Sequence, residues 1–185
     1  ALNYADVTVE LREVLLRDKP RAMLQASAKG TVPVLVLPDG RVIDESVDVM
    51  RWALKQRDTD QWWRDGLQDE TDKLLNENDF VFKTHLDQYK YADRYPEHPQ
   101  SHNRDQAEKF LHQLEQKLLL NKYLLADKLT FTDVAIFPFI RQFAFVDKPW
   151  FDQAPYPKLQ RWLQSLLDSD LFLSVMTTYP RWLED

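Results

Sequence analysis

The strongest constraint on the fold is a change of hydrophobic periodicity near residue 60. From there to the end, apolar residues recur every three or four positions, which is the spacing of helices that bury one face. The clearest stripes run over residues 67–89, 107–118 and 159–166. The residues before this point mix strand and helix patterns. The sequence therefore predicts a small α/β domain over residues 1–57 and a helical bundle over residues 62–185, with a polar junction between them.

The first domain is expected to contain three strands and two helices. Residues 7–11 alternate between apolar and polar side chains, which predicts a strand with one buried face. Residues 32–43 contain a continuous apolar run, a Pro-Asp-Gly turn and a return strand, so we expect a hairpin buried on both faces. One helix is expected after Pro20, at a position where helices tolerate proline, and another after Ser46.

The second domain has one marked helix start. Thr130 can cap a helix through its hydroxyl group, and Asp133 can reach back to the backbone of the cap. The following run is apolar nearly all round, so this helix should be central. Pro138 within it predicts a bend. Arg141, on the same apolar helix, is expected to form a buried ion pair.

The composition excludes several classes of function. The 185 residues are 44% apolar, which suffices for a core, and none is cysteine, which excludes disulfides, cysteine-ligated metals and thiol chemistry within them. The formal net charge is −6 and basic residues alternate with acidic ones, which disfavours nucleic acid as a partner. No apolar stretch reaches the roughly 18 residues of a membrane span, and no signal peptide is evident. We expect a cytoplasmic protein that binds no membrane.

A metal site is not expected. His98 and His102 are four residues apart, a spacing that could suit a metal ion on a helix. Pro96 and Pro99 disfavour a helix there, so we expect a surface loop.

Four motifs, taken in order, resemble the cytosolic glutathione transferases. They are a strand entered by Thr31–Leu35, a tight turn, Glu45–Ser46 at a helix start, and the Thr130–Asp133 box in a buried helix. Lys19–Pro20 before the second helix is most similar to the omega-type and bacterial glutaredoxin-like branch. The resemblance covers essentially the whole chain. It implies a truncated thioredoxin-like domain followed by the all-helical C-terminal domain of that family.

The resemblance also implies a glutathione site. It implies that Pro33 follows a cis peptide bond and that the backbone of Val32 pairs with the cysteinyl part of glutathione. Ser46 would meet the γ-glutamyl carboxylate at a helix N-terminus, Glu45 the α-ammonium group, and Lys19 a carboxylate, expected to be the glycyl one. Without the family, Glu45–Ser46 is better explained as a helix cap and Lys19 as a solvated charge.

The catalytic group of the family has no counterpart in this sequence. In the branch it resembles, the nucleophile is a cysteine at the N-terminus of the first helix, whereas residues 1–5 look like the tail of that helix. The strand at residues 7–11 would also lack its neighbour. We expect an upstream segment of roughly 20–25 residues, at average element lengths, that supplies the strand and the thiolate. Residues 1–185 alone would then be inactive. The alternative is that the protein begins at Ala1.

The second substrate is expected on the helical domain. Asp79, Phe80 and Lys83 belong to a segment of aromatic residues with polar groups between them, which suits an open pocket for an organic molecule. Core packing or a subunit contact explains each of these residues about as well.

The resulting expectation is an enzyme that uses glutathione as co-substrate. It would conjugate glutathione to a small electrophile, or transfer or reduce thiols of a disulfide substrate. A homodimer is expected. Two alternatives stay open: a transferase-fold module that binds proteins without catalysis, as in stringent-starvation proteins, and a carrier of small ligands.

Overall fold

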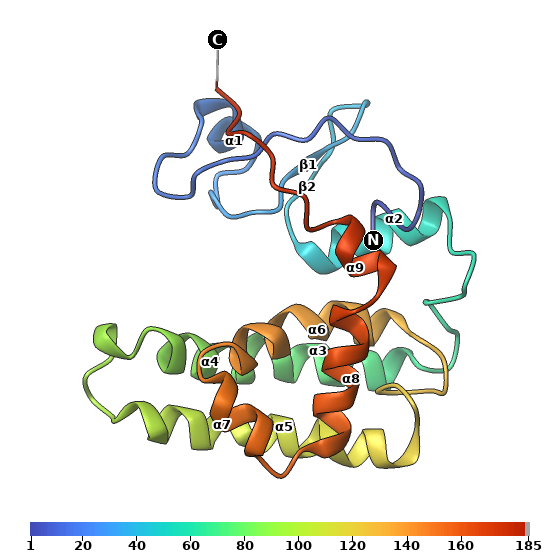
Figure 1. Ribbon diagram of the computed structural model, residues 1–185. Coiled ribbons are helices and arrows are strands. Elements are labelled where there is room, and N and C mark those ends of the chain that lie inside the picture. Colours follow the sequence, from blue (N-terminus) through green and yellow to red (C-terminus); the bar gives the residue numbers. More distant parts are fainter. Residues whose placement is uncertain (184–185) are drawn as a thin grey trace. The chain divides into compact units, whose positions relative to one another are not determined.

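The computed structural model describes residues 1–183. Residues 1–60 and the segment that begins at Leu173 form one compact unit, and Gln61–Phe172 form a second (Figure 1). The C-terminal segment therefore groups with the N-terminal unit and not with the bundle.

The first unit contains a two-stranded sheet and short helices. Strands β1 and β2 are antiparallel, and Leu35 lies opposite Ile43. The elements are α1 (Arg21–Ala26), β1 (Leu35–Val36), β2 (Val42–Ile43) and α2 (Ser46–Gln56), and α9 (Asp170–Ser174) bridges the boundary of the two units in sequence. The expected helices after Pro20 and at Ser46 are confirmed.

The predicted hairpin forms, but it is not buried on both faces. Gly40 adopts a φ of +83°, and its N–H donates to the carbonyl of Leu37 at 2.9 Å, so the predicted turn is confirmed. Val36, in contrast, is 56% exposed. Val36 lies opposite Val42 in the sheet, and Val42 is exposed as well. One face of the hairpin is therefore open, and the apolar run alone does not predict burial of both faces.

The predicted strand at residues 7–11 is also wrong. These residues have no regular structure, and Leu11 is 54% exposed. The nearest pairing is a single parallel bridge between Glu13 and Arg181. A strand needs a partner for its backbone groups, and the two-stranded sheet offers this segment none.

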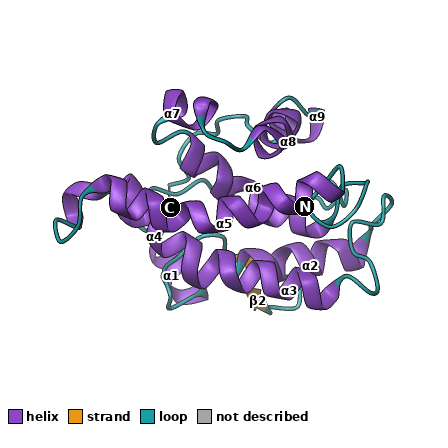
Figure 2. Ribbon diagram, turned by 90° about the horizontal axis from the view of Figure 1, so that it is seen from below, coloured by secondary structure: helices purple, strands orange, loops and turns teal. Residues whose placement is uncertain are grey.

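The second unit is built from helices alone, as the periodicity predicts (Figure 2). The longest helix, α5, packs against both α4 and α8. The elements are α3 (Gln68–Glu77), a π-helical turn (Asn78–Phe82), α4 (Lys83–Lys90), a 3-10 turn (Ala92–Arg94), α5 (Gln100–Leu120), α6 (Phe131–Ala144), α7 (Lys148–Gln153) and α8 (Pro157–Leu167).

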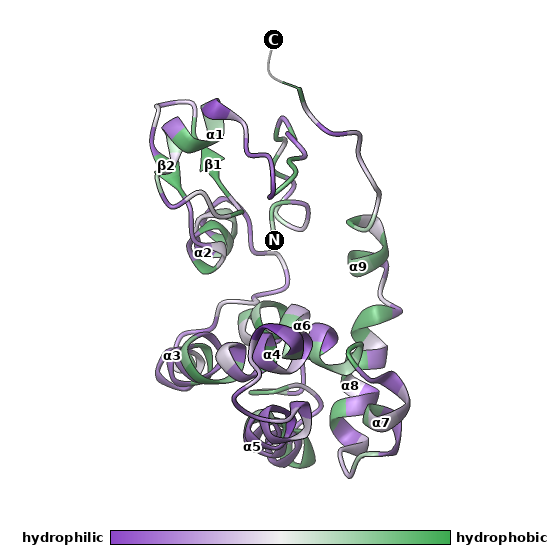
Figure 3. Cartoon of the chain, turned by 90° about the vertical axis from the view of Figure 1, so that its left-hand side faces the viewer, coloured by the Kyte–Doolittle hydropathy of each residue, from purple (hydrophilic) through white to green (hydrophobic). Residues whose placement is uncertain are grey.

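The core of the bundle is an aromatic cluster between its helices. Phe82 lies 5.0 Å from Phe110 and 5.7 Å from Phe143, measured between ring centroids, and all three side chains are buried. Each such burial stabilises the fold by about 1.5–3 kcal/mol. The hydrophobic and hydrophilic sides of the helices can be followed by colour in Figure 3.

The start of α6 is a buried polar junction. The backbone N–H of Thr130 donates to Asp133 Oδ2 at 2.9 Å and its hydroxyl donates at 2.6 Å, so the predicted capping box is confirmed. Asp133 Oδ1 accepts from the backbone of Leu124 at 2.8 Å and from the indole of Trp162 at 2.9 Å. One carboxylate thus joins the preceding loop, α6 and α8. The helix continues through Pro138, and the bend expected there stays a prediction.

Two expectations about charged or polar side chains need correction. Within residues 1–183, Arg141 forms no ion pair; its guanidinium lies over the rings of Phe145 and Phe172, 5.5 and 5.4 Å from their centroids. His102 lies in α5 and not in a loop, because Pro99 stands just before the first helical residue, where proline is tolerated.

No helix among the described residues is long and apolar enough to cross a membrane.

Candidate glutathione site

The start of α2 exposes backbone N–H groups. Glu45 precedes the helix in an extended conformation, with φ −114° and ψ 133°, and Ser46 is the first helical residue. Glu45 makes no side-chain cap to the helix backbone. The first-turn N–H groups are therefore available to an anion, and the helix dipole favours negative charge there.

An ammonium group connects two carboxylates beside this helix start. Lys29 Nζ donates to Glu45 Oε1 at 2.6 Å and to Asp44 Oδ1 at 3.0 Å. The hydroxyl of Ser27 donates to Asp44 Oδ2 at 2.6 Å. Hydrogen bonds to Glu45 and then Asp44 raise the pKa of Lys29. Hydrogen bonds from Ser27 and then Lys29 lower the pKa of Asp44.

Lys19 lies against the same segment. Gly30 has a φ of +60°, and a Cβ placed on it would lie 3.4 Å from Lys19 Nζ. Gly30 directly follows Lys29 in the chain. The short segment from Lys29 to Pro33 therefore approaches Lys19 at Gly30. The same segment contacts Glu45 through the side chain of Lys29. The structure thus brings Lys19 and Glu45 to one loop.

The remaining predicted residues follow in that loop. The Val32–Pro33 peptide bond is cis. Val32 is 49% exposed, and within residues 1–183 its backbone N–H and carbonyl have no hydrogen-bond partner. An exposed backbone with both groups open can pair with an extended peptide as an added strand would.

The charges around the loop suit a small zwitterionic peptide. Lys19 supplies a cation, Glu45 an anion, and the α2 N-terminus a set of N–H donors. Val32 supplies a backbone donor and acceptor between them. Sequence reasoning missed Lys29 and Asp44, because no local pattern indicates a contact made across a hairpin.

Within the described residues, the candidate site contains no cysteine. The hydroxyl of Tyr4 is another group that could act as a nucleophile. It donates to Asp58 Oδ1 at 3.1 Å and accepts from the backbone N–H of Asp60 at 2.6 Å. Burial raises the pKa of Tyr4 to about 12, so the phenol stays protonated at neutral pH.

The three residues predicted for a second substrate lie together in the second unit. Asp79 and Phe80 belong to the π-helical turn, and Lys83 begins α4. Phe80 is 75% exposed, and Lys83 Nζ lies 6.0 Å from the ring centroid of Phe139. Single π-helical turns are frequent at functional sites, so an exposed ring on one is a fair candidate for a ligand contact.

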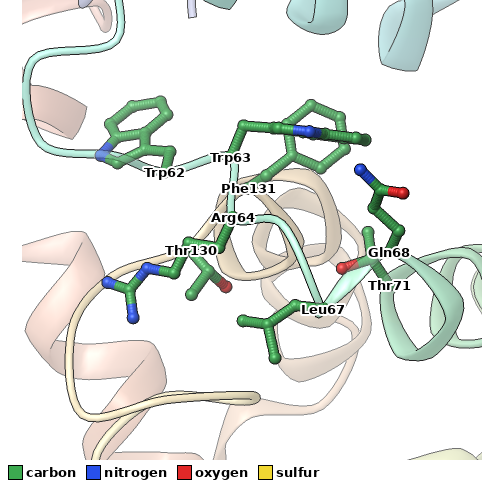
Figure 4. A pocket seen from close by; sticks show the side chains of 8 residues that line it. All are labelled: Trp62, Trp63, Arg64, Leu67, Gln68, Thr71, Thr130 and Phe131. Atoms are coloured by element: carbon green, nitrogen blue, oxygen red, sulfur yellow. The ribbon is translucent and has the colours of Figure 1, made fainter.

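A separate small pocket lies at the start of α6. Trp63 packs edge-to-face on Phe131, with 5.1 Å between the ring centroids (Figure 4). The hydroxyls of Thr71 and Thr132 lie 2.8 Å apart. The pocket is lined by Trp62, Trp63, Arg64, Leu67, Gln68, Thr71, Thr130 and Phe131. None of the predicted second-substrate residues lines it, and its contacts are those of a packing junction.

Two family models match the chain. The glutathione S-transferase N-terminal domain matches residues 1–61, and the glutathione S-transferase C-terminal domain matches residues 63–165. No curated protein matches in a sequence search.

Several solved structures share the fold. The bacterial transferase BphK, solved as a ternary complex, is 22% identical with a TM-score of 0.79, over 94% of this chain and 88% of that one. The glutathione transferase URE2P6 from Phanerochaete chrysosporium, solved with oxidized glutathione, is 18% identical with a TM-score of 0.80, over 94% and 86%. A family member from Pseudomonas fluorescens with two glutathione molecules bound is 16% identical with a TM-score of 0.78, over 94% and 83%.

Proposed function

Because this chain belongs to the glutathione S-transferase family, we propose that its first unit binds glutathione for conjugation or for thiol transfer and reduction. The observation that carries the proposal is the open backbone of Val32, which lies in a loop that also contacts Lys19 and leads to Glu45. A scaffold that only contacts proteins has no need of an open backbone in a loop that contacts one cation and leads to an anion.

Each part of glutathione then has a partner of matching chemistry. The cysteinyl backbone pairs with the N–H and carbonyl of Val32 beside Pro33. The γ-glutamyl carboxylate meets Ser46 and the N–H groups of α2, and the α-ammonium group meets Glu45. Lys19 meets the glycyl carboxylate. Two of the similar structures carry glutathione or its oxidized form, which supports the choice of ligand.

We do not propose a residue within 1–185 that activates the thiol of glutathione. They contain no cysteine, and Tyr4 is held protonated. These residues would bind and orient glutathione, and the thiolate expected upstream of Ala1 stays a prediction. Lys19–Pro20 together with Glu45–Ser46 supports placement in the omega-type and glutaredoxin-like branch.

A second substrate is proposed at the π-helical turn. Phe80 presents an exposed ring, and Asp79 and Lys83 flank it with opposite charges. This combination suits an organic electrophile or disulfide with an apolar body and a polar end.

Calorimetric titration with glutathione tests the proposal. We expect the wild-type chain to release or absorb heat at millimolar glutathione, and the double variant Glu45→Ala, Ser46→Ala to lose most of that binding. Asp48→Ala, on the exposed first turn of the same helix, is the control. No heat and no change in melting temperature for the wild type would favour a non-catalytic protein-binding module. Unchanged binding by the double variant would refute this site.

A further inference from the structure

Lys29 already donates to the carboxylate that the proposed function gives to the ligand's ammonium group. Its Nζ donates to Glu45 Oε1 at 2.6 Å and to Asp44 Oδ1 at 3.0 Å. Ser27 donates to the other oxygen of Asp44 at 2.6 Å. Both oxygens of Asp44 are therefore engaged by the protein itself.

One carboxylate oxygen of Glu45 is open to a ligand. Glu45 Oε2 accepts no hydrogen bond from the described part of the chain, and the Glu45 side chain is 61% exposed. An incoming ammonium group can reach this oxygen. The ligand ammonium and the Lys29 ammonium then both contact the Glu45 carboxylate. Lys29 has already neutralised part of the charge of that carboxylate.

The charge of the cluster follows directly. Asp44 and Glu45 together with Lys29 carry a net charge of −1 instead of −2. The attraction that Glu45 can offer a ligand ammonium is reduced, while among the described residues Lys29 makes no hydrogen bond to Val32 or to Ser46 at the start of α2. Because Lys29 and Glu45 are both well exposed, solvent screening keeps this effect modest.

We propose that Lys29 is an internal competitor of the ligand's α-ammonium group and sets how strongly the site selects γ-glutamyl ligands that carry it. The inference rests on the proposed function. With Lys29 in place, the preference for glutathione over an analogue without the amino group is small. Without its charge, the site favours glutathione.

Two ligands and four proteins test the inference. The ligands are glutathione and glutaryl-cysteinyl-glycine, which replaces the α-ammonium group by hydrogen. The proteins are the wild type, Lys29→Met, Lys29→Arg and Lys55→Met, each titrated by calorimetry at one salt concentration. Lys55, an exposed lysine in the last turn of α2, controls for a general loss of positive charge.

The expected result is a change of selectivity. Lys29→Met should tighten glutathione binding about two- to fivefold, which is the range of an exposed ion pair, and leave the analogue within about 1.5-fold. Lys29→Arg keeps the charge and should keep the wild-type ratio, and so should Lys55→Met. High salt should shrink the difference.

Three outcomes would overturn the inference. If Lys29→Met weakens both ligands equally, Lys29 contacts the ligand or orients the loop and does not compete. If the ratio of the two affinities is unchanged, the ligand ammonium does not meet Glu45. If the wild type binds neither ligand while its melting temperature is normal, the proposed function fails and the inference with it. Equal melting temperatures of wild type and Lys29→Met show that the fold is intact.

Discussion

At the scale of single residues, Asp133 connects the loop before α6, the start of α6 and α8. It accepts hydrogen bonds from Leu124, from two donors of Thr130 and from Trp162, and it is fully buried. Burial raises its pKa in spite of these donors. The carboxylate is a structural junction of the second unit and takes no part in the proposed glutathione site.

Replacing Asp133 should therefore destabilise the bundle strongly. Asp133→Ala leaves four buried donors without an acceptor, and an unsatisfied buried group costs about 1–3 kcal/mol. We expect a loss of at least about 3 kcal/mol in the free energy of unfolding, measured by urea denaturation. Asp105→Ala, on the exposed face of α5, should cost less than about 0.5 kcal/mol. A loss for Asp133→Ala no larger than this control would contradict the assigned role.

In the cluster of Ser27, Lys29, Asp44 and Glu45, we predict that Asp44 titrates at low pH. The folded-state pKa of Asp44 lies below its ordinary value of 3.8, first because of Ser27 and then Lys29. Its contribution to stability is therefore present above pH 3.8 and is lost as the pH falls through the lowered value. The pKa of Lys29 is raised above 10.5, so its contribution is complete below that pH and is lost only as the pH rises through the raised value. The cluster is thus intact across the neutral range.

Ser27→Ala tests this account of Asp44. Without the Ser27 hydroxyl bond, the pKa of Asp44 should rise toward its ordinary value. Carbon-detected NMR titration of the Asp44 side chain measures the shift directly. Lys29→Met should move it in the same direction, by less. A pKa that stays unchanged in Ser27→Ala would show that the bond is not formed in solution.

The sequence indicates some residues of the site and is silent on others for a physical reason. Lys19, Val32, Glu45 and Ser46 could be predicted, because the family resemblance attaches a role to each motif. Lys29 could not, because its partners are about 15 residues away along the chain, and only the folded hairpin and α2 bring them within reach.

At the scale of elements, most helices and the hairpin turn follow from local sequence, whereas the predicted strand at residues 7–11 does not form. The apolar stripes of α5, α6 and α8 and the Thr130–Asp133 box are local signals, because helix hydrogen bonds and caps are local. The first turn of α5 is an exception, since it lies where the sequence predicts a loop. Residues 7–11 alternate as a strand should, yet a strand depends on a partner from elsewhere in the chain. Val36 has a strand partner in Val42 and is nevertheless exposed, because burial of a sheet face depends on what packs on it from elsewhere in the chain.

The C-terminal segment supplies a contact that no periodicity indicates. The backbone N–H of Trp182 donates to the carbonyl of Glu13 at 2.8 Å, and the guanidinium of Arg12 lies 4.7 Å from the Trp182 ring centroid. Arg181 forms an ion pair with Asp18, the residue before Lys19. The last described residues therefore fasten the loop that leads to the proposed carboxylate-binding lysine.

Releasing this contact should loosen that loop locally. Arg181→Ala removes an exposed ion pair worth about 0.2–1 kcal/mol, so global stability should change little. We expect faster amide hydrogen exchange in peptides covering residues 11–19, measured by mass spectrometry. Peptides from α5 serve as the internal control and should be unchanged. Equal exchange over residues 11–19 in both proteins would show that the contact does not restrain the loop.

At the scale of the whole molecule, each unit has its own role in the proposed function. The first unit carries the charges and open backbone suited to glutathione, and the second carries the exposed ring of Phe80. The family resemblance also implies a homodimer. Light scattering coupled to size-exclusion chromatography should give twice the 22.0 kDa mass of one chain. A concentration-independent monomer would contradict this expectation without affecting the glutathione site.

The central claim is that glutathione binds along Val32, between Lys19 and the start of α2. Two-dimensional amide NMR of the isotope-labelled protein, titrated with glutathione to millimolar concentration, tests it most directly. We predict that the largest chemical-shift changes fall on the amides of Val32, Glu45 and Ser46 and that they saturate together. Shifts confined to residues 61–172, or a spectrum unchanged throughout the titration, would contradict the account.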